Sequence, residues 1–343
     1  MIEQAKILLQ RGDREQQALA EIALKNHAAA DRIIQDLKKD PVAEAFRVLT
    51  LEGNNWYNAG EYDRAIGPYE QALALRPKDI EARTNAAVAH QQTQFGDTGA
   101  HLNRAVELFT GSLILAPAVS ENWAMTQNNL GIALKTQGER TEGAAGTQLL
   151  AEAVTAYRKA LEVYTRAALP QGWAATQNNL GTALQTQGER TEGAAGAQLL
   201  VEAVTAHRQA LEVYTRAALP QDWAMTQNNL GIALKTQGER TEGAAGTQLL
   251  AEAVAAHRQA LEVRTRAALP QRWAMTQNNL GNALQTQGER TEGAAGTQLL
   301  AEAVTAYRKA LEVYTSEEFS RHHHLVKGNL ATAEAVLARR QKN

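Results

Sequence analysis

The sequence contains no cysteine, which excludes disulfide bonds, thiolate metal sites and cysteine nucleophiles. An excess of one charge is also missing, because 35 Lys and Arg stand against 37 Asp and Glu and leave a net charge of −2. This balance excludes a strongly basic protein that holds nucleic acid by phosphate neutralisation alone. Aromatic residues are few, at 5%, but 44% hydrophobic and 21% charged residues indicate a soluble, folded chain.

Long apolar runs are absent as well. No stretch approaches the ~18 apolar residues that a membrane-spanning helix needs. Near the N-terminus the apolar run from Ile7 to Leu9 is too short for a signal-peptide core, and Glu3 stands where positive charge belongs. We therefore expect a cytoplasmic protein that does not insert into a membrane.

What the chain does contain is a repeat. Trp123, Trp173, Trp223 and Trp273 follow one another at intervals of 50 residues. The segments 123–172 and 173–222 differ at only 8 of 50 positions. One such unit cannot bury its own apolar face, whereas stacked copies can, so the repeat predicts a stacked array rather than separate globular domains.

Each 50-residue unit is predicted to form two helices. In the first unit one helix is expected over residues 123–137 and a second over about 148–168, where apolar residues recur at helical spacing. Pro170 ends the second helix, because proline has no N–H and disfavours helical geometry in the residue before it. Residues 138–146 are predicted to be a glycine-rich, solvent-exposed loop between the helices.

A shorter repeat precedes these units. It spans 34 residues from Phe46, and its positions 8, 11, 20, 24, 27 and 32 hold Gly53, Trp56, Ala65, Tyr69, Ala72 and Pro77. This pattern resembles the tetratricopeptide repeat, in which small residues let two helices approach and large residues fill the gap. The 50-residue units fit the same template, with positions 7, 8, 11, 20, 24 and 27 held by Leu130, Gly131, Leu134, Ala153, Tyr157 and Ala160. Their Asn-Asn-Leu-Gly text and long second helix are similar to the kinesin-light-chain type of this repeat and to stand-alone bacterial arrays.

The resemblance implies an all-α fold, a helical-hairpin solenoid of the tetratricopeptide type wound into a right-handed superhelix. We expect a degenerate helical hairpin over 1–41, two hairpins of 34 and 40 residues over 42–119, four 50-residue repeats over 120–319 and a capping helix over 320–343. A terminal repeat needs a polar outer face, so the cap should turn four basic residues toward water: Lys327, Arg339, Arg340 and Lys342.

The family geometry also implies a binding surface. In such arrays the first helix of each hairpin lines a concave wall, and its positions 2, 5, 9 and 12 face the groove. Spacings of three, four and three residues do place these positions on one helical face. The candidate groove residues are therefore Met125, Asn128, Ile132, Lys135, Asn178, Thr182, Gln185, Met225, Asn228, Ile232, Lys235, Met275, Asn278, Asn282 and Gln285.

Two features of these candidates point to a ligand, and each has an alternative. The asparagine at position 5 is the same in all four copies and could bond the backbone of an extended peptide, because an amide both donates and accepts. Alternatively, it bridges neighbouring helices within the scaffold. The lysines at 135 and 235 would give the groove a mild positive character that favours an acidic segment, or they are simply solvated.

The patterns typical of catalysis or metal binding are incomplete in this sequence. Residues 138–143 have the glycine spacing of a P-loop, but Ala144 and Ala145 stand where the Lys and Ser/Thr belong. The three consecutive histidines at 322–324 would point about 100° apart on a helix and cannot converge on one ion. The loop is nearly identical in every copy, which leaves open a second, multivalent contact surface there. The repeated tryptophan is expected to pack between hairpins.

Together these patterns predict a non-enzymatic scaffold or adaptor for protein–protein interaction, which holds a peptide or protein segment on its concave surface. No cofactor, metal or nucleic acid is expected. Two alternatives stay open. Near-identical units could associate with one another into homo-oligomers or filaments, or the chain could regulate a separately encoded signalling or defence enzyme.

If the repeated asparagines face a ligand, changing Asn178 and Asn228 together to Ala should leave the melting temperature nearly unchanged and weaken capture of a partner. A collapse of the melting temperature, followed by circular dichroism, would instead assign these amides to the scaffold.

Overall fold

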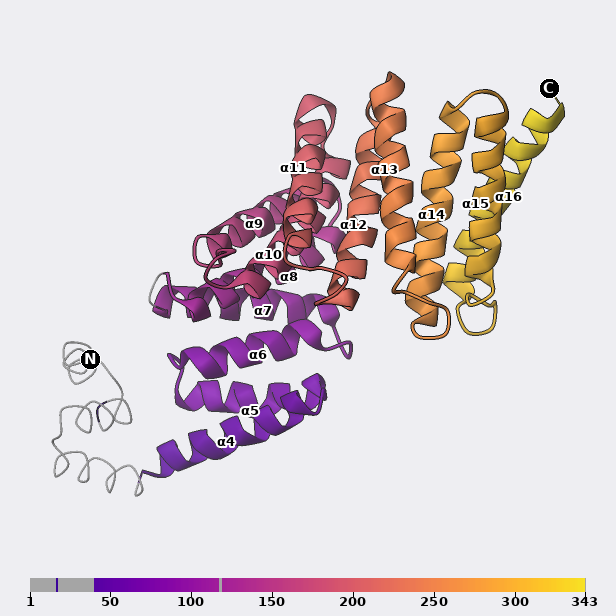
Figure 1. Ribbon diagram of the computed structural model, residues 1–343. Coiled ribbons are helices and arrows are strands. Elements are labelled where there is room, and N and C mark those ends of the chain that lie inside the picture. Colours follow the sequence, from indigo (N-terminus) through magenta and orange to yellow (C-terminus); the bar gives the residue numbers. More distant parts are fainter. Residues whose placement is uncertain (1–16, 18–39, 117–118, 343) are drawn as a thin grey trace. The chain divides into compact units, whose positions relative to one another are not determined.

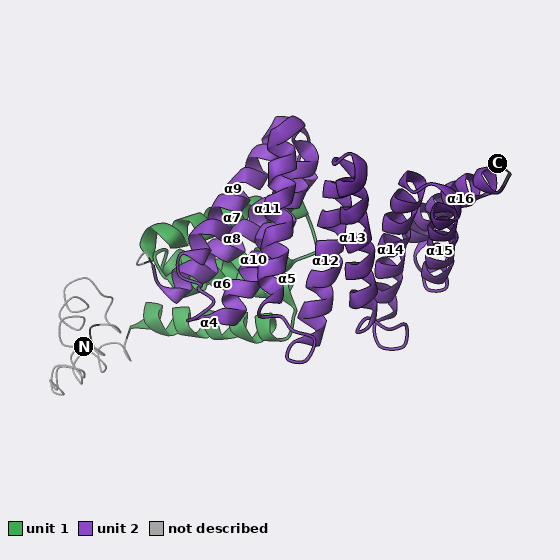
Figure 2. Cartoon of the chain, turned by 45° about the horizontal axis from the view of Figure 1, so that its top comes forward, with its two compact units in different colours: residues 1–118 green, residues 119–343 purple. Residues whose placement is uncertain are grey.

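The computed structural model describes residues 17, 40–116 and 119–342, and these form two compact units, 1–118 and 119–343 (Figure 2). The predicted hairpin over 1–41 lies almost wholly outside the described residues. From residue 40 on, the described chain consists of helices joined by turns, without a strand. In the first unit the helices are α4 (Pro41–Asn58), α5 (Tyr62–Leu75), α6 (Ile80–Gln92) and α7 (Thr98–Leu115).

The second unit repeats one hairpin four times and then adds a single helix (Figure 1). The first helices of the hairpins are α8 (Glu121–Arg140), α10 (Pro170–Arg190), α12 (Pro220–Glu239) and α14 (Pro270–Arg290). The second helices are α9 (Gly143–Leu161), α11 (Gly193–Leu211), α13 (Gly243–Leu261) and α15 (Gly293–Leu311). The last helix, α16 (Ser320–Lys342), takes the place of a further first helix. The all-α hairpin array expected from the sequence is confirmed.

Each hairpin closes where a glycine of the first helix meets a ring of the second. A Cβ atom on Gly131 would lie 2.6 Å from Cε1 of Tyr157, closer than real Cβ atoms come to a neighbour. The same approach recurs at Gly53 against Tyr69 and at Gly181 against His207. Positions 20 and 27 hold fully buried alanines, as in the first 50-residue copy at 153 and 160. The small-and-large pattern thus acts as predicted, because helix axes come this close only where side chains are small.

The loop predicted over 138–146 is mostly helix, and this prediction was wrong. Helix α8 continues to Arg140 and α9 begins at Gly143, which leaves a connection of two residues. Gly143 has a φ of 66°, a conformation that favours glycine. A Cβ on Gly138 would lie 3.0 Å from the carbonyl oxygen of Gly146, so the two helices approach closely at their shared end. The glycines therefore serve the packing of the hairpin and not the flexibility of a loop.

The second helices end earlier than predicted. Helix α9 stops at Leu161, and residues 162–169 form turns that lead to α10. The hydroxyl of Thr165 accepts a hydrogen bond from the N–H of Ala168 at 3.2 Å, and the N–H of Leu169 donates to the Thr165 carbonyl at 2.9 Å. These local bonds offer the backbone an alternative to a continued helix.

First helices lie next to first helices in the second unit. Each of α10, α12 and α14 contacts the first helix before and after it, and α16 contacts α14. No such series of contacts joins the second helices of the described hairpins. The first helices therefore form the inner row of the array and the second helices the outer row, as the family geometry implies.

The cap helix α16 presents polar groups where other repeats are apolar. Glu334 stands where the preceding copy has the buried Leu284, and it forms an ion pair with Arg308 of α15 at 2.7 Å. Lys327 and Arg339 are exposed, as predicted. Arg340 is not free in water, because it bonds backbone carbonyls of the preceding hairpin. For Lys342, the structure describes the backbone as helical and does not describe the side chain.

In the first unit a polar cluster joins three helices. Glu70 of α5 accepts two hydrogen bonds from Arg104 of α7, both of 2.8 Å, and lies 3.0 Å from Nε2 of His90 in α6. Nδ1 of His90 lies 2.8 Å from Nδ1 of His101 in α7. The bonds from Arg104 and His90 lower the pKa of Glu70 to about 2. Nothing in the sequence pattern predicted this cluster, because its members are brought together only by the fold.

Two histidines are buried without partners. His207 and His257 replace the ring of Tyr157 at position 24, are fully buried, and have no hydrogen-bond partner at either ring nitrogen. A neutral imidazole still carries one N–H, so each leaves a donor unsatisfied. Burial lowers the pKa of His207 to about 3, and burial with the positive charges of Arg264 and Lys235 does the same for His257.

We therefore expect the array to lose stability in acid. The folded-state pKa of each histidine lies below the ordinary value of 6.5, so the unfolded chain binds more protons between these values. Stability is complete above about pH 6.5 and falls toward pH 3, by at most about 1.4 kcal/mol per pH unit for each histidine. Urea midpoints followed by circular dichroism between pH 7 and 5 measure this slope.

The control is the double change His207→Tyr and His257→Tyr, which installs the ring that positions 157 and 307 already carry. We expect the pH dependence of the urea midpoint to flatten in this variant. Equal slopes for the variant and the original chain would refute the assignment.

Candidate functional site

The inner row presents a line of apolar side chains at position 2. Met125 and Met275 are 41% and 39% exposed, and Met225 is half-buried. In the second copy this position is Ala175, and in α16 it is Leu325, which is 55% exposed. Because α8, α10, α12, α14 and α16 follow one another in contact, these residues form one line, which we call the methionine row.

Position 9 lies beside the methionine row and differs between copies. Ile132, Thr182, Ile232 and Asn282 are all half-buried. Asn282 accepts hydrogen bonds from the hydroxyl of Tyr307 at 2.7 Å and from the amide of Asn329 at 3.3 Å. Position 9 therefore offers a partner an isoleucine, a threonine or an already engaged asparagine, depending on the repeat.

The asparagines at position 5 bond to the next repeat. The side-chain amide of Asn179 donates to Oδ1 of Asn128 at 3.2 Å. The same bond recurs in each following pair, at 3.1–3.2 Å, from Asn229 to Asn178, from Asn279 to Asn228 and from Asn329 to Asn278. The acceptors at 178, 228 and 278 are buried, with 2–8% of their surface exposed. Of the two interpretations of this ladder, these bonds favour the scaffold.

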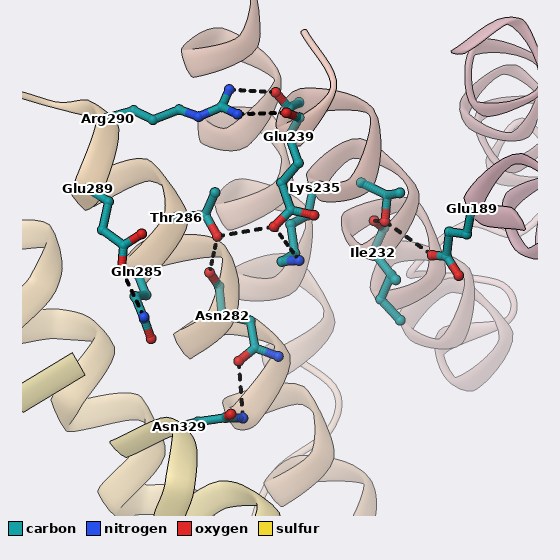
Figure 3. Close-up of polar contacts among 12 residues, drawn as sticks. Glu189, Ile232, Lys235, Glu239, Asn282, Gln285, Thr286, Glu289, Arg290 and Asn329 are labelled. Atoms are coloured by element: carbon teal, nitrogen blue, oxygen red, sulfur yellow. Dashed lines mark hydrogen bonds and ion pairs between the residues drawn. The ribbon is translucent and has the colours of Figure 1, made fainter. Parts of the chain in front are cut away.

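Position 12 is bonded within its own helix. Nζ of Lys135 lies 2.9 Å from Glu139 and Nζ of Lys235 lies 2.7 Å from Glu239. Gln185 and Gln285 donate to the glutamates four residues later at 3.0 and 2.9 Å. Threonine hydroxyls of the following repeat donate to the same row of glutamates, as Thr286 does to Glu239 at 3.4 Å (Figure 3). The lysine charges are thus compensated, so they do not by themselves make the row attractive to an acidic segment.

An arginine at the end of the first helix bonds the hairpin before it, from the second 50-residue copy on. Nη1 of Arg190 donates to the carbonyl oxygens of Gly138 and Thr141 at 2.7 and 2.9 Å, and Nη2 donates to that of Glu139 at 2.9 Å. These carbonyls lie at the end of helix α8 and in its turn, where helical donors run out, although that of Gly138 also accepts from the N–H of Thr141 at 3.2 Å. A positive charge is also favoured at a helix C-terminus. We call this contact the arginine clasp.

The arginine clasp recurs throughout the second unit. Arg240 makes the same three bonds to the end of α10, and Arg290 makes them to the end of α12, where its bonds to Glu239 are drawn in Figure 3. Arg340 bonds the carbonyl oxygens of Glu289 and Thr291 at the end of α14. A Cβ atom on Gly146 would overlap the Thr141 carbonyl and lie 2.6 Å from Nη1 of Arg190, so the clasp requires glycine there. This explains why glycine recurs at the position of Gly146 in every copy. The one sign of the arginine clasp in the sequence is that its arginine recurs every fifty residues, at positions 190, 240, 290 and 340.

An open groove adjoins the clasp at the tips of the hairpins. Its lining includes Glu142, Gln148, Gln187, Arg190 and Glu192. These side chains combine both charges with amides, and no ligand class follows from them. A contact surface at the repeated tips stays a proposal.

The tryptophans and histidines of the repeat have structural neighbours. Trp173 and Trp223 pack against a buried cluster that contains Tyr214, so they lie between hairpins as predicted. His322 stacks on Tyr314 with 4.8 Å between ring centroids, and Nδ1 of His323 donates to the Tyr314 carbonyl at 2.8 Å. In the described part of the chain no three metal-binding side chains gather, and none of the described helices is long and apolar enough to cross a membrane.

Comparison with known proteins gives the fold and not a close relative. No protein-family profile and no curated protein matches the chain. Among solved structures, the APC/C hetero-tetramer Cut9-Hcn1 aligns over 97% of this chain and 52% of its own, with 12% identity and a TM-score of 0.54. PilF of Pseudomonas aeruginosa aligns over 83% and 99%, with 16% identity and a TM-score of 0.50. A tetratricopeptide repeat protein from Parabacteroides merdae aligns over 97% of both chains, with 14% identity and a TM-score of 0.47.

The chain has the tetratricopeptide repeat fold. Paired helices, the glycine–ring contact at positions 8 and 24, and the buried alanines at 20 and 27 all conform to it. At these identities the likeness concerns the fold alone. The narrower similarity to the kinesin-light-chain type stays a prediction.

The arginine clasp should stabilise the array measurably. We expect Arg240→Lys to lower the free energy of unfolding by roughly 1 kcal/mol, because lysine keeps the charge but donates from a single nitrogen, whereas these carbonyls are reached by two separate nitrogens of the planar guanidinium. The partial exposure of the guanidinium keeps the loss small. Urea unfolding measures it, with the exposed Arg339→Lys as control. An equal midpoint for both variants would contradict a stabilising clasp.

The asparagine ladder predicts a loss of stability as well. Changing Asn178 and Asn228 to Ala removes two buried acceptors, and we expect a cost of roughly 1 kcal/mol for each bond. The exposed Asn122→Ala serves as control in thermal unfolding. If the double variant has the same melting temperature as the original chain, the amides are available to a ligand.

Proposed function

We propose that the chain is a non-enzymatic scaffold that binds a segment of another protein along the inner row of its second unit. The methionine row is the observation that carries this proposal. It is apolar and repeated, and it is exposed at Met125, Met275 and Leu325, while the polar groups beside it are bonded to one another. A ligand can therefore bury apolar surface without breaking the bonds that hold the hairpins together.

The repeat also sets the spacing of the ligand. Helices in contact generally lie about 8–10 Å apart, so we expect a similar interval between neighbouring members of the methionine row. A polyproline II segment rises about 3.1 Å per residue with three residues per turn, so every third side chain returns to one face after about 9 Å. We propose that the ligand is an extended segment with an apolar residue at every third position. Methionine suits the surface that receives these residues, because its flexible side chain adapts its shape.

The mechanism proposed is binding alone. Side chains that could carry protons on the inner row, such as Glu139 and Glu239, are held by neighbouring lysines and threonines. Affinity would come from several weak contacts made at once, because each bound repeat raises the effective concentration of the next contact.

Selection from a displayed library of random twelve-residue peptides tests the proposal. We expect selected peptides to carry apolar residues at every third position. Changing the exposed Met125 and Met275 together to Gln should weaken their binding at least tenfold and leave the melting temperature within about 2 °C, because exposed positions contribute little to stability.

The matched control is Val201→Gln, which alters an apolar residue of the outer row that is 42% exposed. It should leave peptide binding unchanged. Peptides that bind the methionine variant as well as the original chain, or that respond equally to Val201→Gln, would refute the inner row as the binding surface. Light scattering over a concentration series measures whether the chain self-associates instead.

A further inference from the structure

The first helices of the second unit repeat every two hairpins as well as every one. Residues 123–140 and 223–240 are identical. Along the four copies, position 9 is Ile, Thr, Ile and Asn, and position 12 is Lys, Gln, Lys and Gln. The first and third copies therefore combine an isoleucine with a lysine, whereas the second and fourth combine a short polar side chain with a glutamine.

A third position of the same face carries a carboxylate in all four copies. Position 16 follows position 12 by four residues and holds Glu139, Glu189, Glu239 and Glu289. Spacings of three and four residues keep positions 9, 12 and 16 on one helical face, which we call the alternating strip. These glutamates are exposed, and the hydroxyl of Thr236 on the next first helix donates to Glu189 at 3.2 Å.

The net charge of the alternating strip changes from one copy to the next. In the first and third copies the lysine at position 12 forms an ion pair with the glutamate at position 16. In the second and fourth copies a glutamine amide bonds this glutamate, and no ion pair with Glu189 or Glu289 is found among the described residues. The arginine clasp reaches the backbone carbonyl of all four glutamates, so it does not distinguish the copies. The second and fourth copies thus carry one more negative charge.

Glu189 is the clearest anionic position of the strip. Figure 3 shows Glu189, Glu239 and Glu289 on three neighbouring first helices. Glu189 lies between two copies whose glutamates are paired with lysine. Beyond Glu289, position 16 of α16 is the exposed Arg339, whose positive charge acts against a second cation there.

A ligand that crosses the strip from α8 to α12 meets Ile132, Glu189 and Ile232 in turn. Helices in contact generally lie about 8–10 Å apart, so we expect about 16–20 Å between the two isoleucines. Six residues of a polyproline II segment span about 19 Å. Positions 9 and 16 lie about 10 Å apart along a helix, so a backbone that runs over position 12 can direct side chains to both.

We propose that the alternating strip binds an extended partner segment in which aliphatic and basic residues alternate at every third position. The proposal rests on the proposed function for a protein partner and adds a second line of contact, about 15 Å along the helices from the methionine row. An aliphatic side chain buries apolar surface against each isoleucine, and a Lys or Arg pairs with Glu189. The selected charge is opposite to that of the acidic segment which the lysines at position 12 alone would favour.

The binding of two proline-rich peptides to the full chain at low ionic strength tests the strip, with fluorescence anisotropy as the measurement. The first peptide is Leu-Pro-Pro-Lys-Pro-Pro-Leu-Pro-Pro-Lys, in which the prolines hold the polyproline II form. The second has the same composition, with each lysine moved one residue toward the N-terminus. We expect the first peptide to bind roughly fivefold tighter, which is the size expected of exposed ion pairs, and the difference to shrink with added salt.

The decisive variant is the double change Gln185→Lys and Gln285→Lys, which installs the residue that the first and third copies carry. Each remaining glutamate then gains a lysine, so the first peptide should bind roughly fivefold more weakly and lose its advantage over the second. The matched control is Gln209→Lys and Gln259→Lys on the outer row, where the first and fourth copies carry lysine. It adds the same charge and should leave the difference between the peptides unchanged.

The reciprocal change Lys135→Gln and Lys235→Gln frees the other two glutamates of the strip. It should make a peptide of four Lys-Pro-Pro units the tighter ligand. Equal binding of the two ten-residue peptides, equal effects of the two lysine-adding variants, or no binding of either peptide would overturn the proposal. Tighter binding of a peptide with glutamate in place of each lysine would overturn the assignment of a basic partner.

The two proposals can fail separately. If the lysine peptide responds to the glutamine changes while no library peptide depends on Met125 or Met275, the methionine row is wrong and the alternating strip stands. If library peptides depend on the methionines but the lysine peptide does not respond to the glutamine changes, only the alternating strip is wrong.

Discussion

A hairpin of two amphipathic helices cannot bury its own apolar face, so every hairpin in this chain depends on its neighbour. Close approach within the hairpin is achieved by glycine against a ring, as Gly131 meets Tyr157. Close approach between hairpins needs polar groups that match as well, because helix ends and amides meet at the same interface. The arginine clasp at one end of the first helices and the asparagine ladder along them meet this need.

The arginine clasp and the asparagine ladder use groups that hold the hairpins together, and these groups are therefore not available to a partner. The clasp uses backbone carbonyls at the helix end, and the ladder uses amides that would otherwise be the obvious ligands for a peptide backbone. What stays accessible on the inner row is chiefly the methionine row and the variable position 9. In the function we propose, recognition depends more on shape and apolar register than on backbone hydrogen bonds.

The sequence predicted the helical hairpins and their packing because both follow from local spacing. The ring at Tyr69 and the alanines around it are readable from one repeat alone. The arginine clasp was not predicted, because Arg190 bonds carbonyls about fifty residues away and backbone acceptors leave no mark in a side-chain pattern. The same limit applies to Glu70 and Arg104, which meet only in the fold. The repeated asparagines allowed two interpretations, and only the partner atom, Oδ1 of the preceding repeat, distinguishes between them.

Because the clasp engages carbonyl oxygens and not side chains, any hairpin of this kind can follow any other. The interface is indifferent to which copy supplies either half, so whole units could be duplicated or deleted without redesign of the joint. Chain length then becomes an adjustable property, and the inner surface can be lengthened in steps of one hairpin. The same property favours misfolding. Two hairpins from different places in the array, or from different chains, can pair during folding as well as neighbouring hairpins do.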